Sequence, residues 1–445
     1  MLIPLLLTSL ACSEKQAPST DSLPSQDTSV QDTSTPNDTA PPPVTLSLQS
    51  EFANETDHMV EVDDIFAIWW DPSVQDHSAD LPILFGWLKE IRSDCLSNLG
   101  MLDPPNPAEG HFYNVYIHHG PNDSFPTSWG NGQGTNSYGL PYLTLPYGAH
   151  LEHGNVLHEG FHIFQYSANS PGFAYSGDSQ WYIESAAQWY QAMNLPTEEM
   201  TFIEAGAIVE NPQLALWHSF SNEAPGDPTD WLYQVRQYGM HTWLYYLTEV
   251  AGINPDIISD GFYAETEQLP QAYHYERVGE DLRVYFADWA AHNTGGLDYL
   301  TAEQVERAWL EVDLVGDPNN RRPNVVELED TDCEGDFIPD EALAPRGWGY
   351  NVVKVNLSSP GSYTVLLGGQ PTGSEGAAAH FEGRVVIEGT TGVRYQSIDM
   401  LDAISGTASV DTFADDSTLY FVIAAVPEHF TGNQTYPYTL NIQRQ

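Results

Sequence analysis

The clearest chemistry in this chain lies at residues 158–162, which read His-Glu-Gly-Phe-His. If this string is helical, the two histidines project from one face, one turn apart, where both imidazoles can bind one metal ion. Glu159 then lies beside the ion, where its carboxylate can take a proton from a metal-activated water. The residue types and their spacing predict a hydrolytic zinc site. The alternative is an amphipathic helix whose histidines only line its polar side.

The residues around this string favour a helix with the histidines at the edge of its apolar face. Asn155 is a good N-cap residue, which predicts that the helix begins at Val156. An apolar stripe at helical spacing is expected to be buried, and it consists of Leu157, Phe161, Phe164 and Ala168. His158, His162 and Gln165 form a second stripe beside it, where a metal ligand can open to a cleft.

Zinc in hydrolytic sites takes three protein ligands and a water, so a third ligand is needed. A metzincin has its third histidine six residues after the second, and Ala168 at that position excludes this class. Residues 178–192 predict a second helix that is capped by Asp178 or Ser179 and ends before Pro196. Glu184 on this helix is the expected third ligand. Two alternatives stay open: Asp178 as the ligand, and a merely structural Glu184.

With these residues the chain resembles the gluzincins, zinc metallopeptidases that carry His-Glu-x-x-His on one helix and a glutamate ligand on the next. The resemblance implies that His158, His162 and Glu184 bind zinc and that Glu159 is the general base. It rests on residues 155–192 and extends in architecture over about residues 50–320. One position departs from the pattern, because Gln188 stands where many gluzincins have an acidic residue that orients the first histidine.

The resemblance also implies a donor for the oxyanion, supplied from downstream of the glutamate ligand. Residues 236–249 predict a helix whose buried side carries Trp243, Tyr246, Leu247 and Val250. Tyr238 and His241 on this segment are the candidate catalytic donors. Tyr175, in the loop before the second helix, is a further candidate.

The predicted fold class is α+β. The helix that carries His158 and His162 is preceded by four predicted elements: an extended segment at 64–70, a helix at 82–96 and strands at 112–119 and 140–146. The resemblance implies a zincin-like domain in which an N-terminal mixed β-sheet is followed by a mainly helical half that carries the zinc helix. It also implies that the edge strand before the metal helix pairs with an extended substrate, a role we assign to residues 138–146. Histidines near the site in sequence are expected to be ordinary strand-end and loop residues: His118, His119, His150 and His153.

The length and the residue patterns of the sequence predict two domains. The metallopeptidase domain covers 46–320, an acidic linker covers 321–346, and an antiparallel β-sandwich covers 347–445. Five short strands with alternating patterns define the sandwich, at 350–357, 362–367, 383–388, 417–425 and 436–442. The acidic run at 330–341 resembles a degenerate thrombospondin type 3 calcium repeat, so Ca²⁺ is a possible ligand there, but a solvated linker is the favoured interpretation.

The N-terminus predicts export. Residues 1–12 resemble a bacterial lipoprotein signal peptide that ends at a lipidated Cys12, although no basic residue precedes its apolar run. A plain secretory signal is the alternative. Residues 13–45 are rich in Ser, Thr, Asp and Pro and predict a disordered tether. In an exported protein, Cys95 and Cys333 could form a disulfide.

The formal net charge of −48 predicts that the protein does not bind nucleic acid. The expected function is a zinc-dependent metallopeptidase that hydrolyses extracellular or periplasmic proteins, held to a membrane only by its lipid anchor. The expected location is the bacterial outer membrane or cell surface, with a periplasmic or secreted protein as the alternative. A non-enzymatic surface adhesin or binding lipoprotein with a structural or vestigial metal site is the alternative function.

Overall fold

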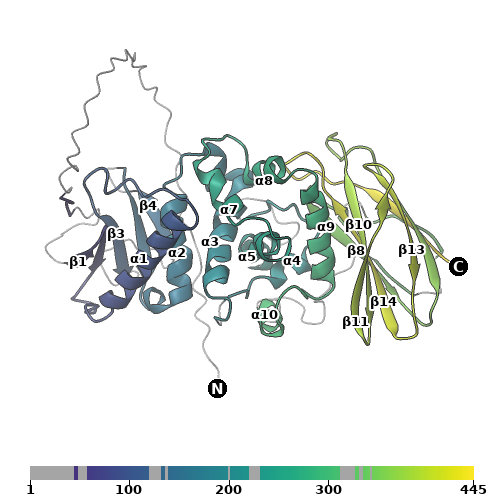
Figure 1. Ribbon diagram of the computed structural model, residues 1–445, viewed down its shortest axis with the longest axis horizontal. Coiled ribbons are helices and arrows are strands. Elements are labelled where there is room, and N and C mark those ends of the chain that lie inside the picture. Colours follow the sequence, from purple (N-terminus) through teal and green to yellow (C-terminus); the bar gives the residue numbers. More distant parts are fainter. Residues whose placement is uncertain are drawn as a thin grey trace, which may run out of the picture. The chain divides into compact units, whose positions relative to one another are not determined.

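The computed structural model describes residues 45–48, 58–119, 132–135, 139–198, 201–219, 231–310, 326–329, 334–340 and 343–445. The fold is α+β, with helices and several β-sheets, as predicted (Figure 1). The chain divides into two compact units. Unit 1 contains residues up to 93 and 103–167, and unit 2 contains 94–102 and 168–445. Cys12, the predicted signal peptide and residues 13–44 of the predicted tether lie outside the described residues.

Unit 1 contains a mixed five-stranded sheet with the strand order β1-β2-β3-β5-β4. β2, β3 and β5 run parallel to one another, whereas β1 and β4 pair antiparallel with their neighbours. A tight turn through Asp64, whose φ is 52°, joins β1 to β2, so the predicted strand begins only at Phe66. The strands are β1 Met59–Asp63, β2 Phe66–Trp70, β3 Tyr113–His118, β4 Gly132–Thr135 and β5 Pro141–Pro146.

The prediction that residues 138–146 form the edge strand is wrong. β5 pairs with β3 on one side and with β4 on the other, so its backbone groups face two neighbouring strands. β4 is at the edge of the sheet instead. The prediction failed because β4 reads Gly-Gln-Gly-Thr, which has no apolar alternation. Gly134 is required there, since a Cβ atom would lie 2.3 Å from the Tyr142 ring.

Two helices lie side by side over the sheet of unit 1: α1 Leu81–Ser97, which belongs to this unit up to residue 93, and α2 His153–Gln165 (Figure 1). Gly160 allows their close approach, because a Cβ atom there would lie 2.6 Å from Cδ1 of Ile91. α2 begins at His153 with Glu152 as its N-cap, three residues before the predicted start. The short 3₁₀ helix η2, Ala149–Leu151, leads directly into α2.

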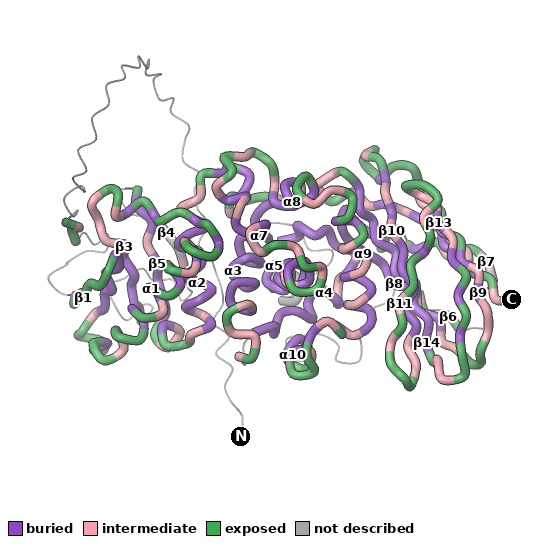
Figure 2. Tube along the Cα trace, viewed as in Figure 1, coloured by how far each residue is buried: buried purple, intermediate pink, exposed green. Residues whose placement is uncertain are grey.

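Asn155 is therefore inside α2 and does not cap it. Its side-chain amide donates a hydrogen bond to the Ala149 carbonyl, 3.3 Å away. The predicted apolar stripe is buried at Leu157, Phe161 and Phe164, whereas Ala168 lies beyond the end of the helix. Most other side chains of α2 are buried as well (Figure 2). The histidines consequently lie in a packed environment, not on a solvated face.

Unit 2 begins with a helical region. α3 covers Gln180–Asn194, and Ser179, one of the two predicted caps, is at the N-cap position without a side-chain capping hydrogen bond. The predicted helix at 236–249 is three elements, because the hydrogen-bond pattern changes at Met240 and again at Tyr246. Its buried side is confirmed at Trp243, Tyr246 and Leu247, but Val250 is 44% exposed.

The remaining elements of this region are short helices and turns. The 3₁₀ helices are η3 Pro171–Phe173, η4 Gly177–Ser179 and η6 Gly261–Tyr263, and the π-helix is η5 Tyr246–Val250. The α-helices are α4 Gly206–Glu210, α5 Trp231–Gly239, α6 His241–Tyr245, α7 Asp256–Asp260, α8 Pro270–Val278, α9 Asp281–Thr294 and α10 Ala302–Ala308.

The C-terminal part of unit 2 is a pair of five-stranded sheets, which we call the C-terminal sheet pair. Their orders are β11-β10-β14-β8-β6 and β12-β13-β9-β15-β7, and one apolar core contains side chains from both sheets. The five predicted strands correspond to β8 Gly349–Asn356, β9 Ser362–Gly369, β10 Phe381–Gly389, β14 Asp416–Ala425 and β15 Tyr438–Arg444. Those not predicted are β6 Val326–Glu329, β7 Glu334–Phe337, β11 Gly392–Ser397, β12 Asp399–Met400 and β13 Ser405–Asp411.

The region predicted as the acidic linker is partly built into these sheets. β6 pairs with β8 and β7 pairs with β15. Asp336, from the predicted calcium run, accepts a hydrogen bond from the Asn441 amide at 2.7 Å. Residues 330–333 and 341 of that run lie outside the described residues. The linker prediction fails for these strands because they are held by main-chain hydrogen bonds, which the charge pattern of a sequence does not reveal.

Cys95 is a buried thiol with no disulfide partner among the described residues, and its pairing with Cys333 stays a prediction. Burial raises the pKa of this thiol well above its usual value, which keeps it protonated. Cys333 lies outside the described residues. Among the described helices, none has the length and apolarity that a membrane span requires.

Candidate metal centre

α2 brings together three of the predicted site residues. His158 and His162 lie one turn apart, with ring centroids 4.9 Å apart and ring planes at 86°. Both side chains are buried, as is Glu159 beside the first histidine. The helix thus presents two imidazoles and one carboxylate on adjoining positions of one turn, which is the arrangement that a hydrolytic metal site needs.

Gln165 fixes the orientation of the second histidine. Nδ1 of His162 lies 2.6 Å from Oε1 of Gln165, three residues further along α2. An amide oxygen can only accept a hydrogen bond, so Nδ1 carries the proton and Nε2 carries the lone pair. A metal ligand needs this tautomer, and a hydrogen bond to the other ring nitrogen is how proteins enforce it. Gln165 lies on the predicted histidine stripe, but the sequence alone gives it no role.

Glu184 lies in unit 2, in the first half of α3, and is buried. Its helix is held by side-chain hydrogen bonds on either side of it. Oγ of Ser185 donates to the carbonyls of Trp181 and Gln237 at 2.7 and 2.6 Å. The indole of Trp189 donates to Oγ1 of Thr248 at 3.2 Å. The carboxylate is therefore carried by a well-anchored helix.

Asp178, the alternative third ligand, has a structural partner within unit 2. Its carboxylate accepts a hydrogen bond from the backbone N–H of Gly432 at 2.9 Å, which ties the start of α3 to the loop before β15. This bond accounts for an acidic residue at that position without a metal. Asp178 is therefore the weaker of the two candidates.

Gln188 lies one turn after Glu184 and is also buried. Its amide nitrogen lies 3.3 Å from Oε2 of Glu204. A carboxylate only accepts, so the amide nitrogen must face Glu204, and the amide oxygen is the atom that can accept a hydrogen bond elsewhere. The glutamine is evident in the sequence, whereas the acidic partner that orients it is evident only in the structure.

The oxyanion candidates lie in unit 2. Nδ1 of His241 is 2.9 Å from the Tyr238 carbonyl oxygen, and the His241 ring packs against Phe202. Because a carbonyl only accepts, Nδ1 of His241 carries a proton, and its Nε2 could donate only in the charged form. Tyr238 is buried, and Tyr175 lies partly buried in the loop before η4.

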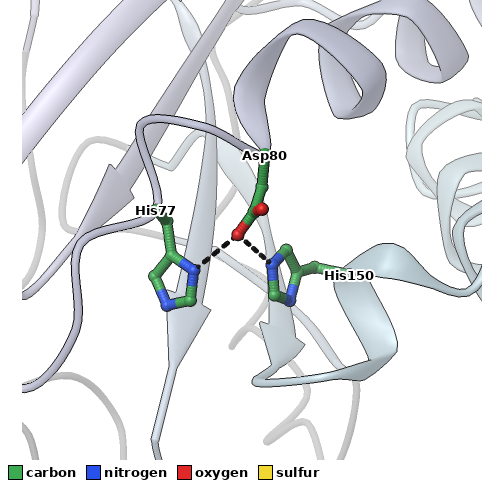
Figure 3. A group of neighbouring side chains, drawn as sticks. All are labelled: His77, Asp80 and His150. Carbon is green, nitrogen blue, oxygen red and sulfur yellow. Dashed lines mark hydrogen bonds and ion pairs between the residues drawn. The ribbon is translucent and has the colours of Figure 1, made fainter.

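A second group of side chains that could hold a metal ion lies in unit 1, and the sequence analysis did not find it (Figure 3). Nδ1 of His77 and Nε2 of His150 approach the same oxygen of Asp80, at 2.9 and 3.2 Å. We call these three residues the His77 cluster. His150 was expected to be an ordinary loop residue, but it is completely buried. A local signal existed in the spacing of His77 and Asp80 just before α1, but no pattern linked them to residue 150.

Comparison with known proteins identifies a family but no activity. A model described as a family of unknown function, DUF6055, matches residues 113–444. The chain belongs to this family. The matched span includes α2, α3 and most of unit 2. No curated protein is significantly similar to the chain.

Several solved structures resemble parts of the chain. The pre-peptidase C-terminal domain of a collagenase from Bacillus anthracis is 12% identical, covers 28% of this chain and 100% of its own, and has a TM-score of 0.18. CorA, a surface-associated copper-binding protein of Methylomicrobium album BG8, is 9% identical over 27% of this chain and 98% of its own, with a TM-score of 0.19. A GH115 4-O-methyl-α-glucuronidase is 9% identical over 78% of this chain and 54% of its own, with a TM-score of 0.16. These TM-scores are low, and no statement on fold or function rests on them.

Proposed function

We propose that the protein is a zinc-dependent metallopeptidase of the gluzincin type. The observation that carries this proposal is the geometry of α2, where two buried imidazoles lie 4.9 Å apart and His162 is held in the metal-binding tautomer by Gln165. An ordinary polar helix face does not need two buried histidines with one ring nitrogen fixed in this way. Glu159, buried beside them, supplies the carboxylate that water activation requires.

In this proposal Glu184 completes the zinc site. We assign the ion to His158, His162 and Glu184, because two histidines with one carboxylate are a known donor set of hydrolytic zinc. Zinc bound there would supply a Lewis acid that lowers the pKa of water towards about 7. Glu159 takes a proton from the attacking water and delivers it to the leaving amine.

Gln188 takes the place of the usual acidic residue in this scheme. Glu204 holds the amide nitrogen of Gln188, so the amide oxygen is presented as the acceptor. We propose that it accepts from the ring N–H of His158, in parallel with the role of Gln165 at His162. The carboxylate of Glu204 then acts on the histidine through the amide, which compensates in part for the missing acid.

For the oxyanion, Tyr238 is a better candidate than His241. A neutral phenol donates a hydrogen bond without a change of charge, whereas Nε2 of the buried His241 could donate only from an imidazolium. Substrate binding is proposed for β4, which is at the edge of the sheet and can add an extended peptide by main-chain pairing.

The proposed setting is an exported lipoprotein anchored at Cys12, with the C-terminal sheet pair as an accessory β-sandwich. A negative net charge of this size favours a self-repelling protein that does not associate with nucleic acid or anionic lipid. Protein or peptide substrates outside the cytoplasm are the expected targets.

The deciding experiment compares Glu159→Gln with Glu152→Gln. Glu152 is an exposed residue at the start of α2, so the same chemical change there is a matched control. We expect Glu159→Gln to retain zinc and to lose casein cleavage by about 10²- to 10⁴-fold, the usual contribution of a general base. The control should cleave casein as the wild type does, with sensitivity to chelator and recovery on addition of zinc.

Full activity of Glu159→Gln would overturn the proposed mechanism. Zinc bound at one ion per chain without cleavage of casein or of a peptide library would instead favour a binding lipoprotein with a structural metal.

A further inference from the structure

We propose that the His77 cluster is a second divalent transition-metal site, of the two-histidine, one-carboxylate type, and that zinc fits it. The site is separate from the α2 histidines and is formed within unit 1. It joins the loop before α1 to η2, the turn that leads into α2. This inference does not depend on the peptidase proposal.

The donor atoms already converge. One oxygen of Asp80 lies 2.9 Å from Nδ1 of His77 and 3.2 Å from Nε2 of His150, and all three donor atoms lie within 4.8 Å of one another. Around a tetrahedral zinc ion with bonds of about 2.0–2.1 Å, neighbouring ligand atoms are separated by about 3.3 Å. The two nitrogen–oxygen distances therefore need to change by only a few tenths of an ångström. The rings are nearly perpendicular, with an interplanar angle of 81°, so both can point at one ion without stacking.

The His77 cluster is buried on the side of its histidines and open to solvent at its carboxylate. Both histidine side chains are completely buried, whereas the Asp80 side chain is 25% exposed. An ion can therefore reach the carboxylate from solvent and be held by rings that the protein keeps dry. The His119 ring stacks on Tyr147, with centroids 4.7 Å apart, beside this cluster.

The remaining ring nitrogens have partners that suit metal ligands. Nε2 of His77 lies 3.0 Å from Nε2 of His119, so it can donate its proton when Nδ1 binds an ion. The His150 ring also has two backbone partners: Nδ1 accepts a hydrogen bond from the N–H of Gly148 at 3.2 Å, and the ring interacts with the carbonyl of Pro146. A hydrogen bond from a ring N–H to a backbone carbonyl is a common way to hold a zinc-binding histidine in place.

The charges also favour a cation. Burial alone would raise the pKa of Asp80, but hydrogen bonds from His77 and His150 outweigh it and lower the pKa, so the carboxylate is ionised. The side chains that face this carboxylate are the two imidazoles of His77 and His150. A divalent ion would neutralise the carboxylate in a chain whose net charge of −48 concentrates cations around it.

The test counts zinc ions in the full-length protein with the α2 histidines removed. The background is the double variant His158→Ala with His162→Ala, stripped with chelator, loaded with Zn²⁺ and freed of excess ion by gel filtration. We expect this background to retain about one tightly bound zinc per chain, since the His77 cluster is intact. Adding His150→Ala, or the nearly isosteric Asp80→Asn, should reduce the zinc content to near zero.

His111→Ala in the same background is the matched control, because His111 is a histidine of unit 1 that bonds to Ser47 and is not part of the cluster. It should keep its zinc. Co²⁺ loaded in place of Zn²⁺ gives a visible absorption band from a protein site of low coordination, and this band should vanish with His150→Ala. Melting curves confirm that each variant is folded, and Zn²⁺ should raise the melting temperature of the background but not of the Asp80→Asn variant.

A folded background variant without zinc would overturn the second site and leave the α2 proposal standing. Unchanged zinc content after both His150→Ala and Asp80→Asn would overturn it as well. A third outcome would separate the two proposals. If the wild-type protein has no peptidase activity and holds one zinc that His150→Ala removes, the result supports this site and contradicts the proposed function.

Discussion

The α2 histidine pair and the His77 cluster use the same residue types in two different ways. The pair lies within one helical turn, and its spacing follows from helix geometry alone. The cluster joins a loop to a turn 70 residues away, so it exists only once unit 1 has folded. Glu159 stands beside the pair as an additional carboxylate, whereas the one carboxylate of the cluster is already shared by both of its histidines. From this difference we expect a catalytic role for the proposed α2 site and a structural role for the proposed site at the cluster.

The largest expected effect is a difference in casein cleavage between a variant of the α2 site and a variant of the His77 cluster. His162→Ala removes a zinc ligand of the proposed catalytic site, and we expect casein cleavage to fall by at least about 100-fold, more than loss of an outer-shell partner costs. His77→Ala should lower turnover by less than about tenfold and should mainly lower the zinc content and the melting temperature. Equal losses of activity in the two variants would erase the distinction.

The next effect concerns the hydrogen bond that orients His162. Gln165→Leu removes the acceptor at Nδ1, and we expect zinc affinity and turnover to fall by about 10- to 100-fold. Gln165→Glu keeps an acceptor and should retain most of both. Zinc affinity can be measured by competition with a chromophoric chelator. Identical affinities for the two variants would show that Gln165 does not set the tautomer.

These two sites also show how far the sequence could predict the molecule. α1, α2, α3 and the strands β3, β8 and β14 were found because their apolar spacing is local. The start of α2 was missed because η2 supplies the cap region and Glu152 replaces Asn155. β4 has no apolar pattern, so the position of β5 inside the sheet could not be foreseen. The His77 cluster depends on long-range contacts, which no spacing rule describes.

A smaller effect is expected at the contact between α2 and α1, which only the α2 site depends on. Gly160→Ala places a methyl group against Cδ1 of Ile91, and Ile91→Val removes that atom. Alone, Gly160→Ala should be close to neutral, because the gain in helix propensity of about 1 kcal/mol is offset by the contact. In the Ile91→Val background it should stabilise, which gives a coupling of about 1 kcal/mol in a double-mutant cycle of urea unfolding. If the changes in the free energy of unfolding of the two single variants add up in the double variant, α1 and α2 can move apart without loss of stability.

The smallest expected effect is the pH dependence of the metal-free cluster. The pKa of His150 is lowered from 6.5, so the folded state resists protonation, and stability is complete above pH 6.5 and falls as the pH drops below it. The pKa of Asp80 is lowered from 3.8, so its contribution is present above pH 3.8 and is lost as the pH falls through its lower folded value. The Asp80 carboxylate raises the pKa of His150 against burial, so we expect Asp80→Asn to lower that pKa further and to increase the stability lost below pH 6.5, by no more than about 1 kcal/mol, while the contribution of Asp80 itself near its own pKa disappears. The profile is measured in chelator from neutral to acidic pH. A pH profile identical to that of the wild type would show that Asp80 is not engaged by the two histidines.

The contact between Gly160 and Ile91 has a consequence for the history of the family. The third residue of the metal motif is a variable position in the general pattern, yet here its size is set by a side chain of another helix. Among relatives that match this family, residues at these two positions are expected to change together, with a larger residue at one wherever the other becomes smaller. Searches for distant members can use this pair as a marker, since it links the motif to a helix outside the span that the family model covers.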